Sequence, residues 1–191
     1  MSVLKIKNFS IGNQERMTLM GGVNVLESES VVMTVAEKFA ETTSSLNINW
    51  IFKGSFDKAN RSSISSFRGP GLDEGLKMLE RVKSEFDTPV ITDIHEVSQA
   101  DPVSKICDVI QIPAFLCRQT DLLIAAAKTN KIINVKKGQF LAPWDMVNVT
   151  KKISDSGNKN ILVTERGASF GYNTLVSDMR ALPIMAKNGY Q

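Results

Sequence analysis

The stretch of sequence that most constrains the fold is PVITDIHEVSQADPVSKICDVIQI, residues 89–112. Its two ends, Pro89–Thr92 and Val109–Ile112, are short apolar runs that predict buried strands. Between them, Val97–Lys105 has the length and composition of a helix. Short strands that are apolar on both faces are typical of a parallel sheet covered by helices. The stretch therefore predicts one strand–helix–strand unit of an α/β protein.

The same alternation of strand and helix continues on both sides of this unit. Further strands are expected at Met17–Val23, Ile48–Phe52, Ile132–Val135 and Asn160–Val163, and further helices at Val32–Ala40, Leu72–Phe86, Asp121–Thr129, Pro143–Ile153 and Leu175–Ala186. Ser28 or Ser30 can cap the first helix, Pro143 suits a first turn, and Gly157 suits a helix end. Periodicity alone leaves two folds open, a doubly wound sheet and a (β/α)₈ barrel.

The N-terminus and the number of units bear on domain organisation. Val3–Phe9 and the turn Ile11–Asn13 predict a small hairpin, so residues 1–14 are interpreted as an N-terminal hairpin extension. Residues 1–191 are interpreted as a single (β/α) barrel domain. A complete barrel has eight units and typically about 250 residues. We therefore expect about six of the eight units here, with the chain truncated at its C-terminus.

Composition restricts the classes of partner. A net charge of +3 over 191 residues gives no signature of nucleic-acid or membrane binding. No apolar run approaches the roughly 20 residues of a membrane span, and no secretory signal opens the chain. Two cysteines, Cys107 and Cys117, form neither a disulfide framework nor a metal-ligand pattern. The sequence predicts a cytoplasmic protein with small-molecule partners.

Charged and polar residues gather where the predicted strands end. These strand-end residues are Lys53, Asp93, His95, Gln111, Lys136, Lys137, Glu165 and Arg166. The carboxyl ends of parallel strands share one face, and buried charges there cost free energy unless they are paired or bind a ligand. Lysine and arginine bind phosphate and carboxylate well. The pattern predicts an anion site, although an ordinary salt bridge remains the alternative at any single position.

Several motifs occur in order along the chain. They are GGVNVLES (21–28), FKGSFDKANRSS (52–63), FRGPGL (67–72), ITDIHE (91–96), QIPAFL (111–116), NVKKGQF (134–140) and ERGASFGY (165–172). This set closely resembles the 3-deoxy-D-manno-octulosonate-8-phosphate synthase family, also called 2-dehydro-3-deoxyphosphooctonate aldolases, over nearly the whole chain from about residue 17. The resemblance implies a (β/α)₈ barrel, usually a homotetramer. It also implies condensation of phosphoenolpyruvate with D-arabinose 5-phosphate, a step of lipopolysaccharide synthesis.

The resemblance also implies roles for individual residues. Phosphoenolpyruvate would be bound by Lys53, Lys58, Gln111, Lys136 and Arg166, and arabinose 5-phosphate by Asn60, Arg61, Ser62, Asp93 and Phe115. Lys136, Asn24 and Asp93 are the candidates for catalytic residues. Metal-dependent members carry cysteine where this chain has Asn24, and an amide is a poor ligand for Zn²⁺ or Fe²⁺. The metal-independent type, without metal or cofactor, is therefore expected.

Two other functions remain open at this point. The related heptulosonate-phosphate synthases use erythrose 4-phosphate, and Ala59-Asn60 favours arabinose 5-phosphate instead. A non-catalytic relative that only binds phosphoenolpyruvate is the other possibility. Outside the proposed site, Cys117 is expected to be a partly exposed structural thiol and Trp50 a core residue. His95 is interpreted as a hydrogen-bonded structural histidine.

Overall fold

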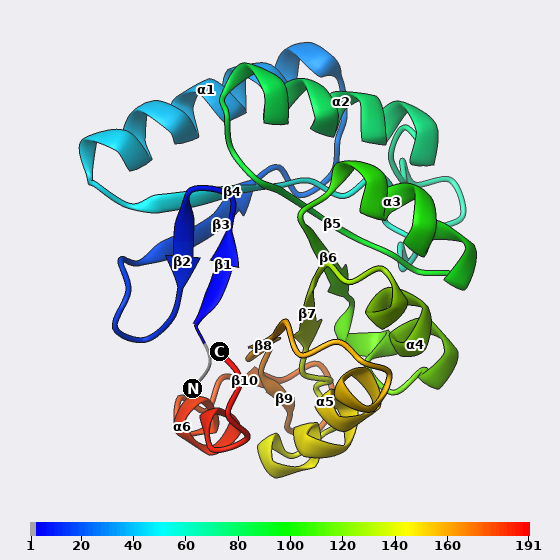
Figure 1. Ribbon diagram of the computed structural model, residues 1–191. Coiled ribbons are helices and arrows are strands. Elements are labelled where there is room, and N and C mark those ends of the chain that lie inside the picture. The colour runs from blue at the N-terminus through cyan, green and yellow to red at the C-terminus, as the bar shows by residue number, and fades with distance from the viewer. Residues whose placement is uncertain (1–2) are drawn as a thin grey trace.

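Six parallel strands form a curled sheet in the computed structural model, which describes residues 3–191 (Figure 1). The strands are β3 (Thr18–Gly22), β4 (Asn49–Lys53), β5 (Val90–Asp93), β6 (Val109–Ile112), β7 (Ile132–Lys136) and β8 (Ile161–Thr164). Their order in the sheet is their order in the chain, with β3 and β8 at the edges. A doubly wound sheet reverses direction at a switch point, whereas this one does not. The fold is a partial (β/α) barrel, which confirms the predicted class.

The helices follow one another around the outside of the sheet (Figure 1). They are α1 (Glu29–Ser45), α2 (Leu72–Glu85), α3 (Ala100–Ile106), α4 (Thr120–Lys128), α5 (Met146–Asp155) and α6 (Ala181–Ala186), with 3₁₀ turns at Val97–Gln99, Ala114–Leu116 and Pro143–Asp145. The Ser28 hydroxyl accepts a hydrogen bond from the Val31 amide at 3.4 Å and caps α1. Gly157 follows α5 with φ of +98°, a conformation that favours glycine. Both helix boundaries agree with the sequence-based prediction.

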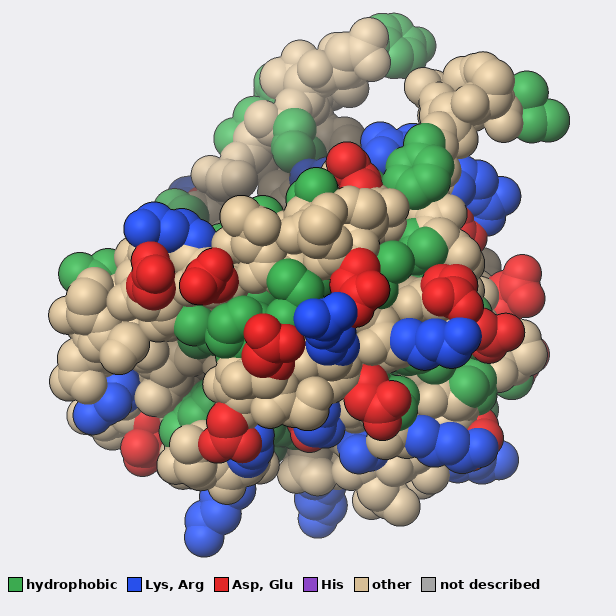
Figure 2. Space-filling model, turned by 90° about the horizontal axis from the view of Figure 1, so that it is seen from above, with side chains coloured by type: hydrophobic (Ala, Val, Ile, Leu, Met, Phe, Trp, Pro, Cys, Tyr) green, Lys and Arg blue, Asp and Glu red, His purple; other side chains and the backbone are tan. Residues whose placement is uncertain are grey.

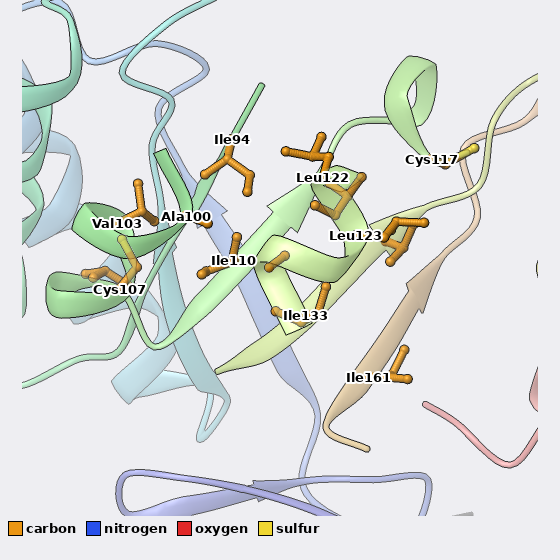
Figure 3. Close-up of a cluster of buried hydrophobic side chains, with 14 of the residues drawn as sticks. Ile94, Ala100, Val103, Cys107, Ile110, Cys117, Leu122, Leu123, Ile133 and Ile161 are labelled. Carbon is orange, nitrogen blue, oxygen red and sulfur yellow. The ribbon is translucent and has the colours of Figure 1, made fainter. Parts of the chain in front are cut away.

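Apolar side chains fill two separate regions, one on each face of the sheet. The outer cluster lies between the strands and the helices, where Ile110 and Ile133 meet Leu123 (Figure 3). Trp50 belongs to this cluster, as predicted, and its indole Nε1 donates to the Gly21 carbonyl at 2.9 Å. The inner cluster consists of Leu4, Ile6, Ile51, Ile91, Val109, Ile132 and Leu162. The sheet is therefore apolar on both faces over much of its length, as the strand sequences indicated.

The N-terminal hairpin supplies part of the inner cluster. Strands β1 (Leu4–Ile6) and β2 (Phe9–Ile11) pair in antiparallel fashion. Leu4 and Ile6 are only 3% and 4% exposed because they pack against the inner face of the curled sheet. The hairpin is confirmed, but its predicted turn at Ile11–Asn13 is wrong. The chain reverses at Lys7 (φ +49°) instead, because Phe9–Ile11 is the second strand.

The helix predicted at Leu175–Ala186 is much shorter than expected. Leu175–Val176 forms strand β10, which pairs with β9 (Ala168–Ser169) in a small antiparallel hairpin. The helix α6 begins only after Asp178, whose carboxylate accepts hydrogen bonds from the amide and the guanidinium of Arg180. Leu175 and Val176, which fit the apolar pattern of a helix, pair with β9 instead, and the prediction was wrong for this reason.

The outer helical surface carries mixed charges. Over the face shown in Figure 2, lysine, arginine, aspartate and glutamate side chains alternate with hydrophobic ones. Arg81 of α2 pairs with Glu29 of α1, and Lys77 pairs with Glu74 within α2. Exposed pairs of this kind each contribute little to stability. Within residues 3–191, no helix is both long enough and apolar enough to cross a membrane.

Candidate active site

A cavity of about 950 Å³ opens at the carboxyl ends of the parallel strands. We call it the mouth cavity. Its lining includes Asn24, Lys53, Lys58, Asn60, Arg61, Asp93, Gln111, Phe115, Lys136 and Arg166. These are all of the residues to which the sequence assigned a substrate-binding or catalytic role except Ser62, which is exposed and outside the lining. The structure therefore brings residues from the ends of all six parallel strands and from one long loop to a single opening.

The strands position these side chains by their alternation. Lys53, Asp93 and Lys136 are the last residues of β4, β5 and β7. Successive strand residues point to opposite faces, so each of these residues shares a face with the residue two positions earlier. For β4 and β5, that earlier residue belongs to the inner apolar cluster, namely Ile51 and Ile91. The charged ends of these strands thus stand on a packed apolar base.

Asp93 is the centre of a hydrogen-bonded group and is only 6% exposed. The Ser55 hydroxyl donates to its Oδ1, and the Lys58 ammonium donates to the Ser55 Oγ at 2.8 Å. Lys53 Nζ lies 3.5 Å from Oδ1, and His95 Nε2 lies 3.3 Å from Oδ2. Burial alone raises the pKa of Asp93, but the hydrogen bonds and the lysine charges outweigh it and hold the pKa well below its usual range. Asp93 is therefore a carboxylate at neutral pH.

The lysines of the mouth cavity crowd one another. Burial lowers the pKa of Lys58, and the charges of Lys53 and Lys136 lower it further against the opposing effect of Asp93. Burial also lowers the pKa of Lys136, with Lys53 and Arg166 acting in the same direction. Like charges held this close favour the binding of an anion, which relieves their repulsion. The electrostatics of the mouth cavity are those of an anion site.

Two of these cations are unpaired. In the part of the chain that the structure describes, residues 3–191, no ion pair or side-chain hydrogen bond involves Lys136 or Arg166. Lys53, by contrast, has Asp93 as its partner. The donors of Lys136 and Arg166 are therefore available to a ligand, and a phosphate group offers the acceptors that suit them.

Gln111 is oriented by a chain of buried side chains. The Thr164 hydroxyl donates to Asn134 Oδ1 at 2.7 Å, and Asn134 Nδ2 donates to Gln111 Oε1 at 3.4 Å. Asn134 and Gln111 are 2% and 4% exposed. Since the Gln111 carbonyl oxygen is occupied, its amide nitrogen is the end left for the mouth cavity. A donor group facing the cavity again suits an anionic ligand.

Arg61 lies on the long loop between β4 and α2, residues 54–71. Its Nε donates to the Phe67 carbonyl within the same loop at 3.2 Å. Gly69 holds the base of the loop with φ of +136°, and a Cβ there would lie 2.2 Å from the Phe56 carbonyl oxygen. Only glycine fits that position. The loop is therefore fixed at its base, while Arg61 itself is exposed.

Sequence reasoning missed some residues of this region. Ser55, which bridges Lys58 and Asp93, was not proposed; its position two residues after a strand-end lysine was the available signal. Gln139 lines the mouth cavity, and its buried Oε1 has no hydrogen-bond partner in the described part of the chain. The partial exposure predicted for Cys117 was wrong, because this thiol is fully buried against Gly138. Burial accordingly raises the pKa of Cys117.

Two strand-end residues predicted at the mouth do not line the cavity. Lys137 is buried and Glu165 is partly buried, and Lys137 Nζ lies 3.7 Å from Glu165 Oε1. Lys137 is the residue after β7, so its side chain points to the face opposite that of Lys136.

The surroundings of Asn24 bear on metal binding. Asn24 lines the mouth cavity and offers a neutral amide, whereas Zn²⁺ and Fe²⁺ prefer thiolate or imidazole at such positions. Among residues 3–191, no group of three or more histidine, cysteine, aspartate and glutamate side chains is arranged to hold a metal ion.

A partial (β/α) barrel with a cation-lined cavity at the carboxyl ends of its strands has the architecture of a barrel enzyme, in which this face holds the active site. The sequence model of the DAHP synthetase I family matches residues 2–191, and the chain belongs to this family.

The relatives are more specific. The chain is 54% identical to the 2-dehydro-3-deoxyphosphooctonate aldolase of Trichlorobacter lovleyi, covering 98% of the chain and 69% of that protein. The proteins of the same name from Fusobacterium nucleatum and Protochlamydia amoebophila are 56% and 52% identical; the matches cover 98% and 97% of this chain and 67% of each relative. The family resemblance drawn from the motifs, and the enzyme class with it, is confirmed.

Proposed function

We propose that this chain condenses phosphoenolpyruvate with D-arabinose 5-phosphate and water, giving 3-deoxy-D-manno-octulosonate 8-phosphate and inorganic phosphate. This is the reaction of a 2-dehydro-3-deoxyphosphooctonate aldolase, the name that its relatives carry. The observation that carries the proposal is the convergence of Lys53, Lys136 and Arg166 on one cavity. The product supplies lipopolysaccharide synthesis, and we place the enzyme in the cytoplasm.

Phosphoenolpyruvate carries a phosphate and a carboxylate, so it needs two cationic subsites. Lys136 and Arg166 clamp the phosphate, since both are unpaired within residues 3–191. Lys53 and Lys58 neutralise the carboxylate from the side of the cavity that holds Asp93. The free amide of Gln111 donates a further hydrogen bond. The phosphate subsite thus uses two unpaired cations, whereas the carboxylate subsite uses the donors of Lys53 and Lys58 that Asp93 and Ser55 leave over.

The pentose phosphate lies toward the long loop. Arg61 pairs with its distal phosphate, with Asn60 and Ser62 beside it and Phe115 along the sugar. Ser62 is exposed and outside the lining, so its contact requires the loop to close over the substrate. Asp93, at the centre of the cavity, accepts hydrogen bonds from sugar hydroxyls in its carboxylate form.

The chemistry then needs one carbon–carbon bond and one water. Carbon 3 of phosphoenolpyruvate attacks the aldehyde carbon, while water adds at carbon 2. The hemiketal phosphate that results loses inorganic phosphate by carbon–oxygen cleavage. Fixed cations stabilise the developing charges, and Lys136, whose pKa is lowered by burial, can move a proton at the aldehyde oxygen. The Asn24 amide orients the attacking water.

We further propose that the reaction is metal-independent and that the active form is a homotetramer. The amide of Asn24 supports the first point because it replaces the thiolate of metal-dependent relatives. The measurement is activity after dialysis against EDTA. Full retention supports the proposal, and a large loss restored by Mn²⁺ would overturn it.

Release of inorganic phosphate from phosphoenolpyruvate tests the reaction itself. Arabinose 5-phosphate and erythrose 4-phosphate are supplied in parallel. We expect rapid release with arabinose 5-phosphate and little with erythrose 4-phosphate. The reverse preference would assign the chain to heptulosonate-phosphate synthesis. Binding of phosphoenolpyruvate without release in either assay would make it a non-catalytic relative.

A further inference from the structure

Lys137 is a buried cation to which the proposed reaction gives no role. It is 2% exposed and immediately follows Lys136, yet it lies outside the lining of the mouth cavity. Burying a charge costs several kcal/mol unless its donors are satisfied. A lysine in such a place needs partners, and those partners indicate what it does.

Within residues 3–191, the partners of the Lys137 ammonium lie in the two segments that follow β7 and β8. Its ammonium donates to the carbonyls of Gly138 at 3.2 Å, Leu141 at 3.3 Å and Gly167 at 2.9 Å. It also lies 3.7 Å from Glu165 Oε1. The first two partners belong to its own segment, and the last two belong to the segment after β8. One ammonium group therefore joins the two segments.

The two partners after β8 are the immediate neighbours of Arg166 in the chain. Glu165 Oε1 accepts a hydrogen bond from the Gly167 amide, so these neighbours are also bonded to each other. Gly167 has φ of +82°, which turns the chain sharply after Arg166. The backbone on both sides of Arg166 is thus held by a closed set of contacts, in which Lys137 is the one cation among residues 3–191.

The Arg166 side chain has no comparable support of its own. Within residues 3–191 it forms no hydrogen bond or ion pair, and it is exposed at the mouth. Its position relative to Lys136 therefore depends on where its backbone is held. A group that fixes this backbone also fixes the distance between the two cations that clamp phosphate.

We propose that Lys137 is a positioning residue for Arg166. Its ammonium holds Glu165 and Gly167, and through them it sets the guanidinium of Arg166 opposite Lys136 for binding of a phosphate group. The inference deepens the proposed function and rests on it for the identity of the substrate. The phosphate subsite itself can be tested with or without turnover.

The test is a double-mutant cycle on phosphate binding. Calorimetry measures the affinity of wild type, K137M, R166M and K137M/R166M for inorganic phosphate and for phosphoenolpyruvate. We expect about ten-fold weaker binding in K137M, and little further loss when K137M is added to R166M. Lys159, exposed in the loop between α5 and β8, provides the matched control, and K159M should bind like wild type.

A purely structural role predicts a different pattern. It would lower the melting temperature of K137M while leaving phosphate affinity unchanged, or it would give losses that simply add in the double variant. Either result overturns the inference. In turnover, K137M should raise the KM for phosphoenolpyruvate and leave the KM for arabinose 5-phosphate within about two-fold, a separation that general loosening would not give.

A second variant covers the case in which K137M does not fold. E165Q keeps an oxygen that can accept from the Gly167 amide but removes the negative charge beside Lys137. We expect about three-fold weaker phosphate binding; unchanged binding would contradict the inference. Coupled phosphate binding without turnover of either aldose would refute the proposed reaction and leave the positioning role supported. Wild type that binds neither anion would refute both.

Discussion

The two ends of the curled sheet are built from the same strands and differ completely in chemistry. At the amino end, Ile51, Ile91, Val109, Ile132 and Leu162 pack against Leu4 and Ile6 of the hairpin. At the carboxyl end, two residues further along each strand, stand Lys53, Asp93, Gln111, Asn134 and Thr164. Since a strand repeats every two residues, both sets face inward. One short strand thus supplies a packed base and a reactive mouth.

On each strand, the residue that stabilises the fold and the residue that faces the mouth cavity are thus two positions apart. The amino end buries apolar surface, which stabilises the fold, and none of its residues has a role in the proposed binding of substrate. At the carboxyl end, burial and the charges of neighbouring lysines lower the pKa of Lys58 and Lys136. This crowding of like charges is unfavourable until an anion binds. Substitutions at the two ends should therefore affect different measurements.

Removing Lys136 should have the largest effect, and it should fall on activity. K136M loses one of the two phosphate contacts and the group proposed to move a proton, so kcat/KM should drop about 10³-fold, equivalent to about 4 kcal/mol. The melting temperature should stay the same or rise, because a partly buried, unpaired charge is removed. Steady-state kinetics and thermal unfolding check both. A clear loss of stability with activity retained would break the comparison.

Truncating Ile91 should have the opposite signature. I91A leaves a cavity in the inner apolar cluster, and the free energy of unfolding should fall by about 2–4 kcal/mol. The KM of the folded enzyme for either substrate should remain within about two-fold of wild type. Chemical denaturation and kinetics below the unfolding transition test this expectation. A large change in KM with normal stability would show that the two ends are not separable.

Asp93 should link the mouth to pH. Its pKa in the folded protein lies below the unfolded value of about 3.9, so it stabilises the fold above that pH and loses this contribution as pH falls through the folded value. At neutral pH, D93N should be less stable than wild type by about 2 kcal/mol. The difference should shrink below about pH 4. A difference that grows on acidification would contradict the assignment.

The chain from Thr164 to Gln111 should give the smallest effect. T164V removes the hydroxyl that donates to Asn134 Oδ1 and should cost about 1 kcal/mol of stability. With Asn134 free to turn, the Gln111 amide is less well oriented, and the KM for phosphoenolpyruvate should rise a few-fold. S154A, which alters an exposed end of α5, is the control. An unchanged KM would contradict the claim that Thr164 orients Gln111 through Asn134.

The sequence predicted the parts of the fold that depend on local pattern. Val109–Ile112 was placed correctly because an apolar run bounded by polar residues has few other uses in an α/β protein. Helix ends at Ser28 and Gly157 followed from capping chemistry. The barrel-like order of the strands was not available from periodicity and became visible only from the strand pairing, or by resemblance.

The site was predictable because strand ends in a parallel sheet meet at one face. From this rule alone, Lys53, Asp93 and Lys136 are expected to lie together, and all three line the mouth cavity. The same rule does not tell which of Lys136 and Lys137 faces the mouth cavity. The face to which a strand-end residue points depends on the register of the strand. The helix predicted from Leu175 was wrong for a related reason. Leu175 pairs with Ser169, and a pattern within residues 175–186 does not reveal a partner outside them.

The most direct test is a crystal structure of the protein soaked with phosphoenolpyruvate. We expect the phosphate within hydrogen-bonding distance of both Lys136 and Arg166, and the carboxylate beside Lys53. Phosphoenolpyruvate bound elsewhere, or bound in the mouth cavity with Lys136 and Arg166 turned away from it, would refute the proposed phosphate site.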